Sequence, residues 1–205
     1  MICIDRYRRP AYGCAMRWNA LFDDLEAQLA EAEVLGRESE VSERARAELA
    51  SIGMADRLRG SLGRSVGVHL VSGTDFLGTL SHAGAESLVI DEAAHQILIP
   101  YSAVSHYRGI GRYALAEPSA VRRRLGLANA LRSLARDRAP LTVLLAAGTA
   151  REVRISGVID RVGRDFLDLA VTPPGEARRA SNVVDVATVP FGSLLALRSM
   201  RPGEL

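Results

Sequence analysis

The chain has 205 residues and a formal net charge of +2, with 48% hydrophobic and 24% charged residues. This balance excludes a disordered chain, because disordered segments combine low hydrophobicity with high net charge. No apolar run approaches the roughly 20 residues that cross a bilayer, so no transmembrane helix is expected.

The first segment, residues 1–15, is predicted to be a flexible tail. It contains both cysteines, Cys3 and Cys14, which fit neither a disulfide framework nor a metal site. It also lacks the apolar core of a secretory signal, so we expect a cytoplasmic protein. Residues 200–205 are expected to form a second, C-terminal tail.

Residues 16–54 are predicted to form an acidic, helical N-terminal arm. Asn19 is a candidate N-cap, and apolar residues then recur at spacings of three and four, as on one face of a helix. We expect helices over 19–35 and 40–52 on either side of Gly36, or one bent helix. Two interpretations stay open: the arm packs on the rest of the chain, or it dimerises as a coiled coil, for which only about two heptads are visible.

The segments 55–113 and 140–199 carry the same strand pattern. Both have short apolar runs separated by glycines and end in an apolar residue, a proline and an aromatic residue. The matched pairs are Gly73 with Gly148, Gly78 with Gly157, Gly84 with Gly163 and Pro100 with Pro190. A short helical segment precedes each copy, at 55–62 and near 128–132. Such matching predicts an internal repeat.

Each copy has the pattern of a small closed β-barrel. The strands are short, alternate apolar and polar residues, and contain a glycine where a tight barrel must bend. Gly78 and Gly157 are therefore expected to occupy the same bend of the second strand of each copy. The predicted fold class is α+β, mainly β, with two five-stranded barrels, helical lead-ins and an N-terminal helical arm.

Each copy resembles the Sm-like small barrel, over roughly 55–110 and 128–199. SH3-like barrels with a helical lead-in have nearly the same pattern. The resemblance implies a helix followed by five bent strands. The Asp-x-Met-Asn loop with which Sm proteins contact RNA is replaced here by residues 82–87 and 161–165, so no family RNA contact carries over. The whole chain also resembles a family of small high-GC bacterial proteins labelled as transcriptional regulators, although it has no helix-turn-helix pattern.

The linker 114–139 is strongly basic, and Pro118 and Ser119 open a predicted helix over 120–136. Arginines bind phosphates without sequence preference by releasing counterions. The candidate nucleic-acid-binding residues in and beside the linker are Arg108, Arg112, Arg122, Arg123, Arg124, Arg132, Arg136 and Arg138. The alternative is that the helix packs by its leucines while its arginines pair with the acidic N-terminal arm.

No motif for catalysis or for metal binding is found. The four histidines match no zinc-ligand spacing. Ser105 and His106 are adjacent, so on a strand they face opposite ways and cannot form a nucleophile–base pair. We therefore expect a protein that is not an enzyme and has no cofactor or metal.

Two functions are consistent with these observations. The first hypothesis is a non-enzymatic, nucleic-acid-associated regulatory protein that binds RNA or DNA, with RNA favoured, through the basic linker and the adjoining barrel surface. The second is a protein-interaction adaptor or scaffold, which binds a protein partner or a second copy through barrel edges and the N-terminal helices. Fold analogy supports both and decides neither.

Overall fold

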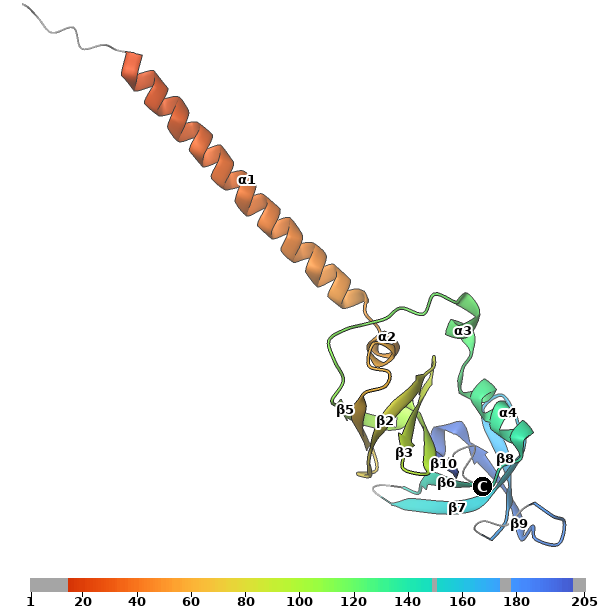
Figure 1. Ribbon diagram of the computed structural model, residues 1–205. Coiled ribbons are helices and arrows are strands. Elements are labelled where there is room, and N and C mark those ends of the chain that lie inside the picture. The colour runs from red at the N-terminus through yellow and green to blue at the C-terminus, as the bar shows by residue number, and fades with distance from the viewer. Residues whose placement is uncertain (1–14, 149–150, 174–177, 201–205) are drawn as a thin grey trace, which may run out of the picture. The chain divides into compact units, whose positions relative to one another are not determined.

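The computed structural model describes residues 15–148, 151–173 and 178–200, and divides the chain into two units, 1–51 and 52–205 (Figure 1). The predicted tail over 1–15 thus lies almost entirely outside the described residues, as does most of the tail over 200–205. No helix in the described part of the chain combines the length and the apolarity that crossing a bilayer requires.

In the first unit, the described residues form one helix, α1 (Ala15–Ser51). The helix runs through Gly36, so of the two expectations a single helix is confirmed and two helices separated at this glycine are wrong. A single glycine costs a helix about 1 kcal/mol but leaves its hydrogen bonds intact. Two ion pairs, each between residues one helical turn apart, lie around and after this glycine: Arg37 with Glu33 at 3.0 Å, and Arg44 with Glu40 at 2.7 Å. The expected N-cap, Asn19, lies inside the helix.

The second unit is built on one open, ten-stranded antiparallel sheet with the strand order β5-β1-β2-β3-β4-β10-β6-β7-β8-β9. The strands of its first half are β1 (Ser65–Leu70), β2 (Asp75–Ala83), β3 (Ser87–Glu92), β4 (His95–Pro100) and β5 (Val104–Arg108). Those of its second half are β6 (Leu141–Ala146), β7 (Glu152–Val162), β8 (Phe166–Val171), β9 (Asp185–Pro190) and β10 (Leu194–Met200). The coarse prediction of an α+β, mainly β chain is therefore confirmed.

The internal repeat appears in the strand order and in the register. Both halves place their strands in the order fifth, first, second, third, fourth. Gly78 lies opposite Val66 in the first half, and Gly157 lies opposite Leu141 in the second. The one-turn 3₁₀ helices Tyr101–Ala103 and Phe191–Ser193 also follow the matched prolines. The prediction that the two glycines occupy the same position of the second strand is confirmed.

Two separate, closed barrels are not confirmed, because β4 of the first half pairs with β10 of the second. Leu98 lies opposite Leu197 at this joint. At this joint each half contributes a side chain to the hydrophobic core of the other half. Leu195 of β10 belongs to the first core, and Leu98 of β4 belongs to the second. Pairing two strand edges satisfies backbone groups that a five-stranded half alone would expose.

Three short helices complete the second unit: α2 (Met54–Arg59), α3 (Ala120–Arg124) and α4 (Leu127–Asp137). Leu58 of α2 and Leu131 of α4 are fully buried, so α2 and α4 are the lead-in helices of the two halves. The prediction of one linker helix over 120–136 is wrong. The helix is interrupted at Gly126, because the Glu86 carboxylate accepts a hydrogen bond from the Leu127 backbone N–H at 2.7 Å and so caps the N-terminus of α4.

Candidate nucleic-acid interface

One side of α4 carries a polar stripe that consists of Asn129, Arg132, Ser133 and Arg136. Their spacings of three and four residues place them on one face of the helix, while Leu127 and Leu131 are buried on another. The Arg132 guanidinium donates to Asn129 Oδ1 at 3.3 Å, and that of Arg136 donates to Ser133 Oγ at 3.1 Å. The stripe thus holds two arginines one turn apart.

A bulge in β7 supplies a third arginine. The pairing of β7 with β8 shifts between Ile159 and Arg161, and the pairing of β2 with β3 shifts at the matching place, between Leu80 and His82. Bulges re-aim the side chains that follow them. Arg161 and His82 are therefore equivalent residues of the two halves, and they line the same cleft.

This cleft, which we call the α4 cleft, lies between α4 and the sheet where the two halves meet. Its volume is about 710 Å³. It is lined by residues of both halves: His82, Gly84, Ser87, Val89, Leu98, Leu125, Gly126, Asn129, Ala130, Arg132, Ser133, Ala135, Arg136, Asp160, Arg161 and Val162. Three arginines thus border a depression whose walls include valine, leucine and alanine side chains.

A second depression, the α3 cleft, adjoins the first and has a volume of about 470 Å³. It shares His82, Gly84 and Leu125 with the α4 cleft and adds Arg59 and Arg122. Arg59 pairs with Asp56 at 2.5 Å and donates to the Leu115 carbonyl oxygen at 3.2 Å. The two clefts together form a continuous surface bordered by five arginines from α2, α3, α4 and β7.

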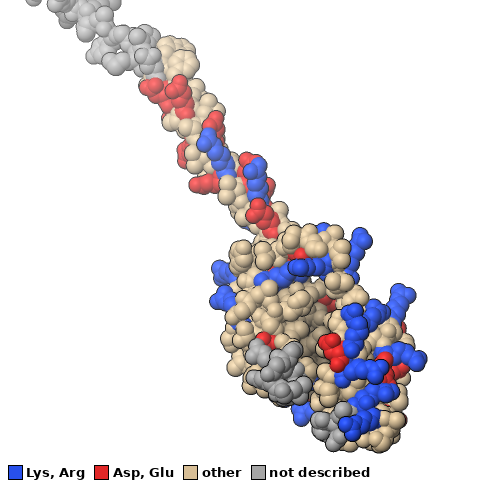
Figure 2. Space-filling view, turned by 45° about the vertical axis from the view of Figure 1, so that its right-hand side comes forward, with Lys and Arg blue, Asp and Glu red and all other residues tan. Residues whose placement is uncertain are grey.

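Acidic side chains at these clefts are few. Asp160 accepts a hydrogen bond from Arg178 at 2.7 Å, and Glu117 accepts one from the Ser119 backbone N–H at 3.0 Å. Figure 2 shows basic side chains at several places on the second unit, most densely on its right-hand side, with acidic side chains among them. The surface therefore attracts anions.

The predicted binding residues divide into three groups. Arg122, Arg132 and Arg136 lie on the two clefts. Two others, Arg123 and Arg124, are exposed on α3, and within the described part of the chain no acceptor is found for their side chains. Successive residues of a helix are about 100° apart, so the three arginines of this run do not share one face.

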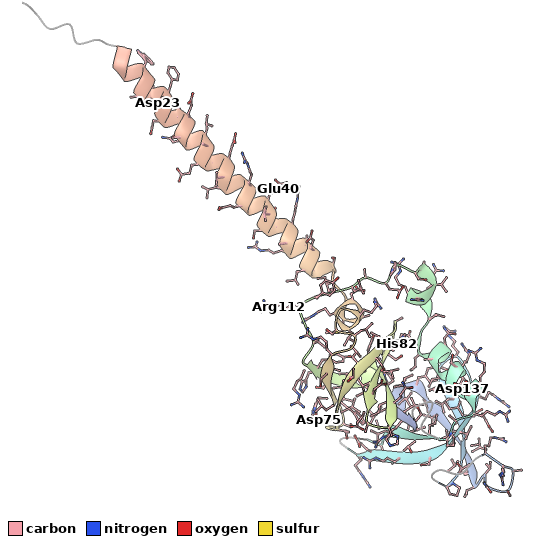
Figure 3. All side chains as sticks on the ribbon, viewed as in Figure 1. Asp23, Glu40, Asp75, His82, Arg112 and Asp137 are labelled. Atoms are coloured by element: carbon pink, nitrogen blue, oxygen red, sulfur yellow. The ribbon has the colours of Figure 1, made fainter. Side chains whose placement is uncertain are left out.

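The remaining candidates lie elsewhere. Arg108 is on β5 and pairs with Asp75 at 3.0 Å. A hydrogen bond with His69, aided by the charge of Arg108, lowers the pKa of the Asp75 carboxyl. Arg112 lies on the loop after β5, on the other side of α2 from the end of α4 (Figure 3). Arg138 follows α4 in a left-handed conformation (φ 50°) and is exposed.

Three residues of the clefts, Arg59, His82 and Arg161, were not predicted from the sequence. Arg161 belongs to the second copy of the repeat, outside the basic linker, and only the bulge turns it toward the cleft. One signal was available: His82 and Arg161 occupy matching positions of the two copies, two residues before Gly84 and Gly163.

No group of three or more histidine, cysteine, aspartate or glutamate side chains gathers into a potential metal site within the described ranges. No family model matches the chain, and no curated protein matches it either.

Proposed function

We propose that this chain binds single-stranded RNA along the α4 and α3 clefts and acts as a non-enzymatic regulatory protein. The observation that carries the proposal is the convergence of four arginines, Arg122, Arg132, Arg136 and Arg161, from α3, α4 and β7 on one surface. Arg59 also lines the α3 cleft, but its side chain is only 12% exposed and is paired with Asp56. Arginine guanidinium groups form bidentate hydrogen bonds with phosphate oxygens.

The shape of the surface favours a single strand over a duplex. α4 packs its leucines into the core, and its arginines border a depression instead of projecting as a ridge. A helix that reads a duplex must enter the major groove, whereas single strands follow basic grooves in which bases meet apolar side chains. The resemblance of each half's sequence to the Sm-like barrel is our reason for proposing RNA instead of DNA, although the loop with which that family contacts RNA is replaced here.

The test removes the cleft arginines without changing side-chain length greatly. In the triple variant Arg132→Gln/Arg136→Gln/Arg161→Gln, affinity for a labelled mixed-sequence RNA of about 12 nucleotides is expected to fall at least about tenfold, measured by fluorescence anisotropy. The slope of log affinity against log salt should shrink by about two, because each phosphate contact of a single strand contributes roughly 0.7.

The matched control is Arg112→Gln/Arg151→Gln/Arg154→Gln, which removes the same charge from exposed residues that line neither cleft. It should change the affinity less than about threefold, since only long-range attraction is lost. Equal losses in both triple variants would contradict a defined site, and a wild-type chain without RNA binding at low salt would end the proposal. Single-stranded DNA of the same sequence should bind more weakly.

The second candidate function, a protein-interaction adaptor, is favoured by α1. Its large apolar side chains are exposed, including Trp18, Phe22, Leu25 and Leu29, at 61%, 56%, 45% and 66%. Isolated helices draw little stability from propensity alone and usually need a packed face. The spacing of these residues by three or four positions suits pairing with the same helix of a second copy.

If α1 mediates self-association, the full chain should sediment as a dimer in analytical ultracentrifugation. Leu25→Glu/Leu29→Glu should then yield a monomer, because it places two charges in the apolar stripe. Glu26→Ala/Glu33→Ala, which alters acidic residues of the same helix, should remain dimeric. A wild-type chain that sediments as a monomer at all accessible concentrations would contradict self-association through α1.

A further inference from the structure

The α4 cleft has the dimensions of a small-molecule site. Its volume of about 710 Å³ falls within the roughly 300–1,000 Å³ of pockets that enclose a compact ligand. A phosphate group alone would leave most of this volume empty. The cleft therefore has room for other parts of a bound strand in addition to its phosphate backbone.

One side of the cleft is apolar. Val89 and Leu98 from the sheet and Ala130 from α4 contribute to its lining. Leu98 is buried in the second core, so the half-buried Val89 and Ala130 provide most of the apolar surface that a ligand can reach. We call these three residues the floor. Aromatic rings bury well against such surfaces, and removing them from water is favourable by about 25 cal/mol per Å² of apolar area.

The other side of the cleft is cationic and partly pre-organised. Arg132 donates to the Gly163 carbonyl oxygen at 3.2 Å as well as to Asn129, and this contact ties α4 to the β7–β8 turn. Arg136 is held by Ser133. Side chains that are already ordered lose less entropy when they bind a ligand. Arg161 is 79% exposed and forms only a long ion pair with Asp168, at 3.9 Å, so it can turn toward a phosphate.

We propose that the α4 cleft is a mononucleotide subsite. One unstacked nucleotide of the bound strand lays its base on the floor and places its phosphate against Arg132, Arg136 and Arg161. Asn129 and Ser133 supply neutral hydrogen-bonding groups beside the base. This inference rests on the proposed function and names the unit of RNA that the cleft recognises.

The direct test measures binding of adenosine 5′-monophosphate and of inorganic phosphate to the full chain by isothermal titration calorimetry. The nucleotide should bind at least about tenfold more tightly than phosphate, since only the nucleotide uses the floor. It should also displace the labelled RNA competitively. Equal affinities for the nucleotide and for phosphate would overturn the subsite and leave a simple anion-binding surface.

Two variants obstruct the cleft without changing charge. Ala130→Leu covers the floor, and Ser133→Leu obstructs the cleft from an exposed position of α4, where it disturbs no core packing. Ala130→Leu should weaken nucleotide binding about tenfold while phosphate binding stays the same. Ser133→Leu also removes the hydroxyl that holds Arg136, so it should weaken nucleotide binding at least about tenfold and phosphate binding to a smaller extent. Arg132→Gln/Arg136→Gln should weaken both. The control Ala146→Leu adds the same bulk at an exposed position of β6 that does not line the cleft.

Failure of this inference is distinguishable from failure of the proposed function. RNA binding that survives both obstructing variants and is not displaced by the nucleotide would overturn the subsite while the strand proposal stands. Nucleotide binding by a chain that does not bind RNA would overturn the strand proposal and support the cleft as a site for a free nucleotide.

Discussion

Replacing Leu131 by alanine is expected to lower the free energy of unfolding by about 3 kcal/mol. Leu131 is fully buried and belongs to the second hydrophobic core. Truncating a buried leucine loses its transfer free energy and leaves a cavity, at a typical total of about 2–5 kcal/mol. The midpoint of urea unfolding should fall by about 1.5 M, for a slope of about 2 kcal/mol/M.

The control for Leu131→Ala is Val121→Ala on α3, whose side chain is 69% exposed. It should change the stability by no more than about 0.5 kcal/mol. If Leu131→Ala cost less than about 1 kcal/mol, α4 would not be packed on the sheet as described. The α4 cleft, which α4 borders, would then lose its physical basis.

Replacing Gly157 by alanine is expected to cost about 2–3 kcal/mol. A Cβ at this position would lie 2.2 Å from the Ala170 backbone oxygen and 3.0 Å from Leu169 Cγ. The backbone oxygen belongs to the paired strand β8 and cannot move without disturbing the sheet. Overpacking of this kind typically costs about 1–3 kcal/mol. Urea unfolding monitored by circular dichroism measures the difference.

The same substitution can be tested at the equivalent glycine of the first half. Gly78→Ala should be destabilising to a similar degree, because its Cβ would lie 2.4 Å from the Asp91 backbone oxygen. Gly192→Ala is the matched control: no atom lies within 4 Å of its added Cβ, so the stability should stay within about 0.5 kcal/mol. Equal stability of Gly157→Ala and Gly192→Ala would contradict the close strand approach.

The candidate site was predictable only in part. The basic linker identified Arg122, Arg132 and Arg136, since a local run of arginines is visible in any single sequence. Arg161 and His82 were missed because their orientation depends on bulges in two strands that lie far apart in the sequence. Bulges arise from the pairing of strands and have no strong signature of their own.

The repeat was visible in the sequence alone, because both copies place glycines and prolines at matching positions, where the backbone restricts the residue type. Close approach of β8 demands a glycine at position 157, and a strand end accommodates Pro190. Tertiary structure alone decided how the halves join. A strand edge exposes backbone groups that any other edge can satisfy, so the pairing of β4 with β10, and with it the α4 cleft, depends on contacts distant in the chain.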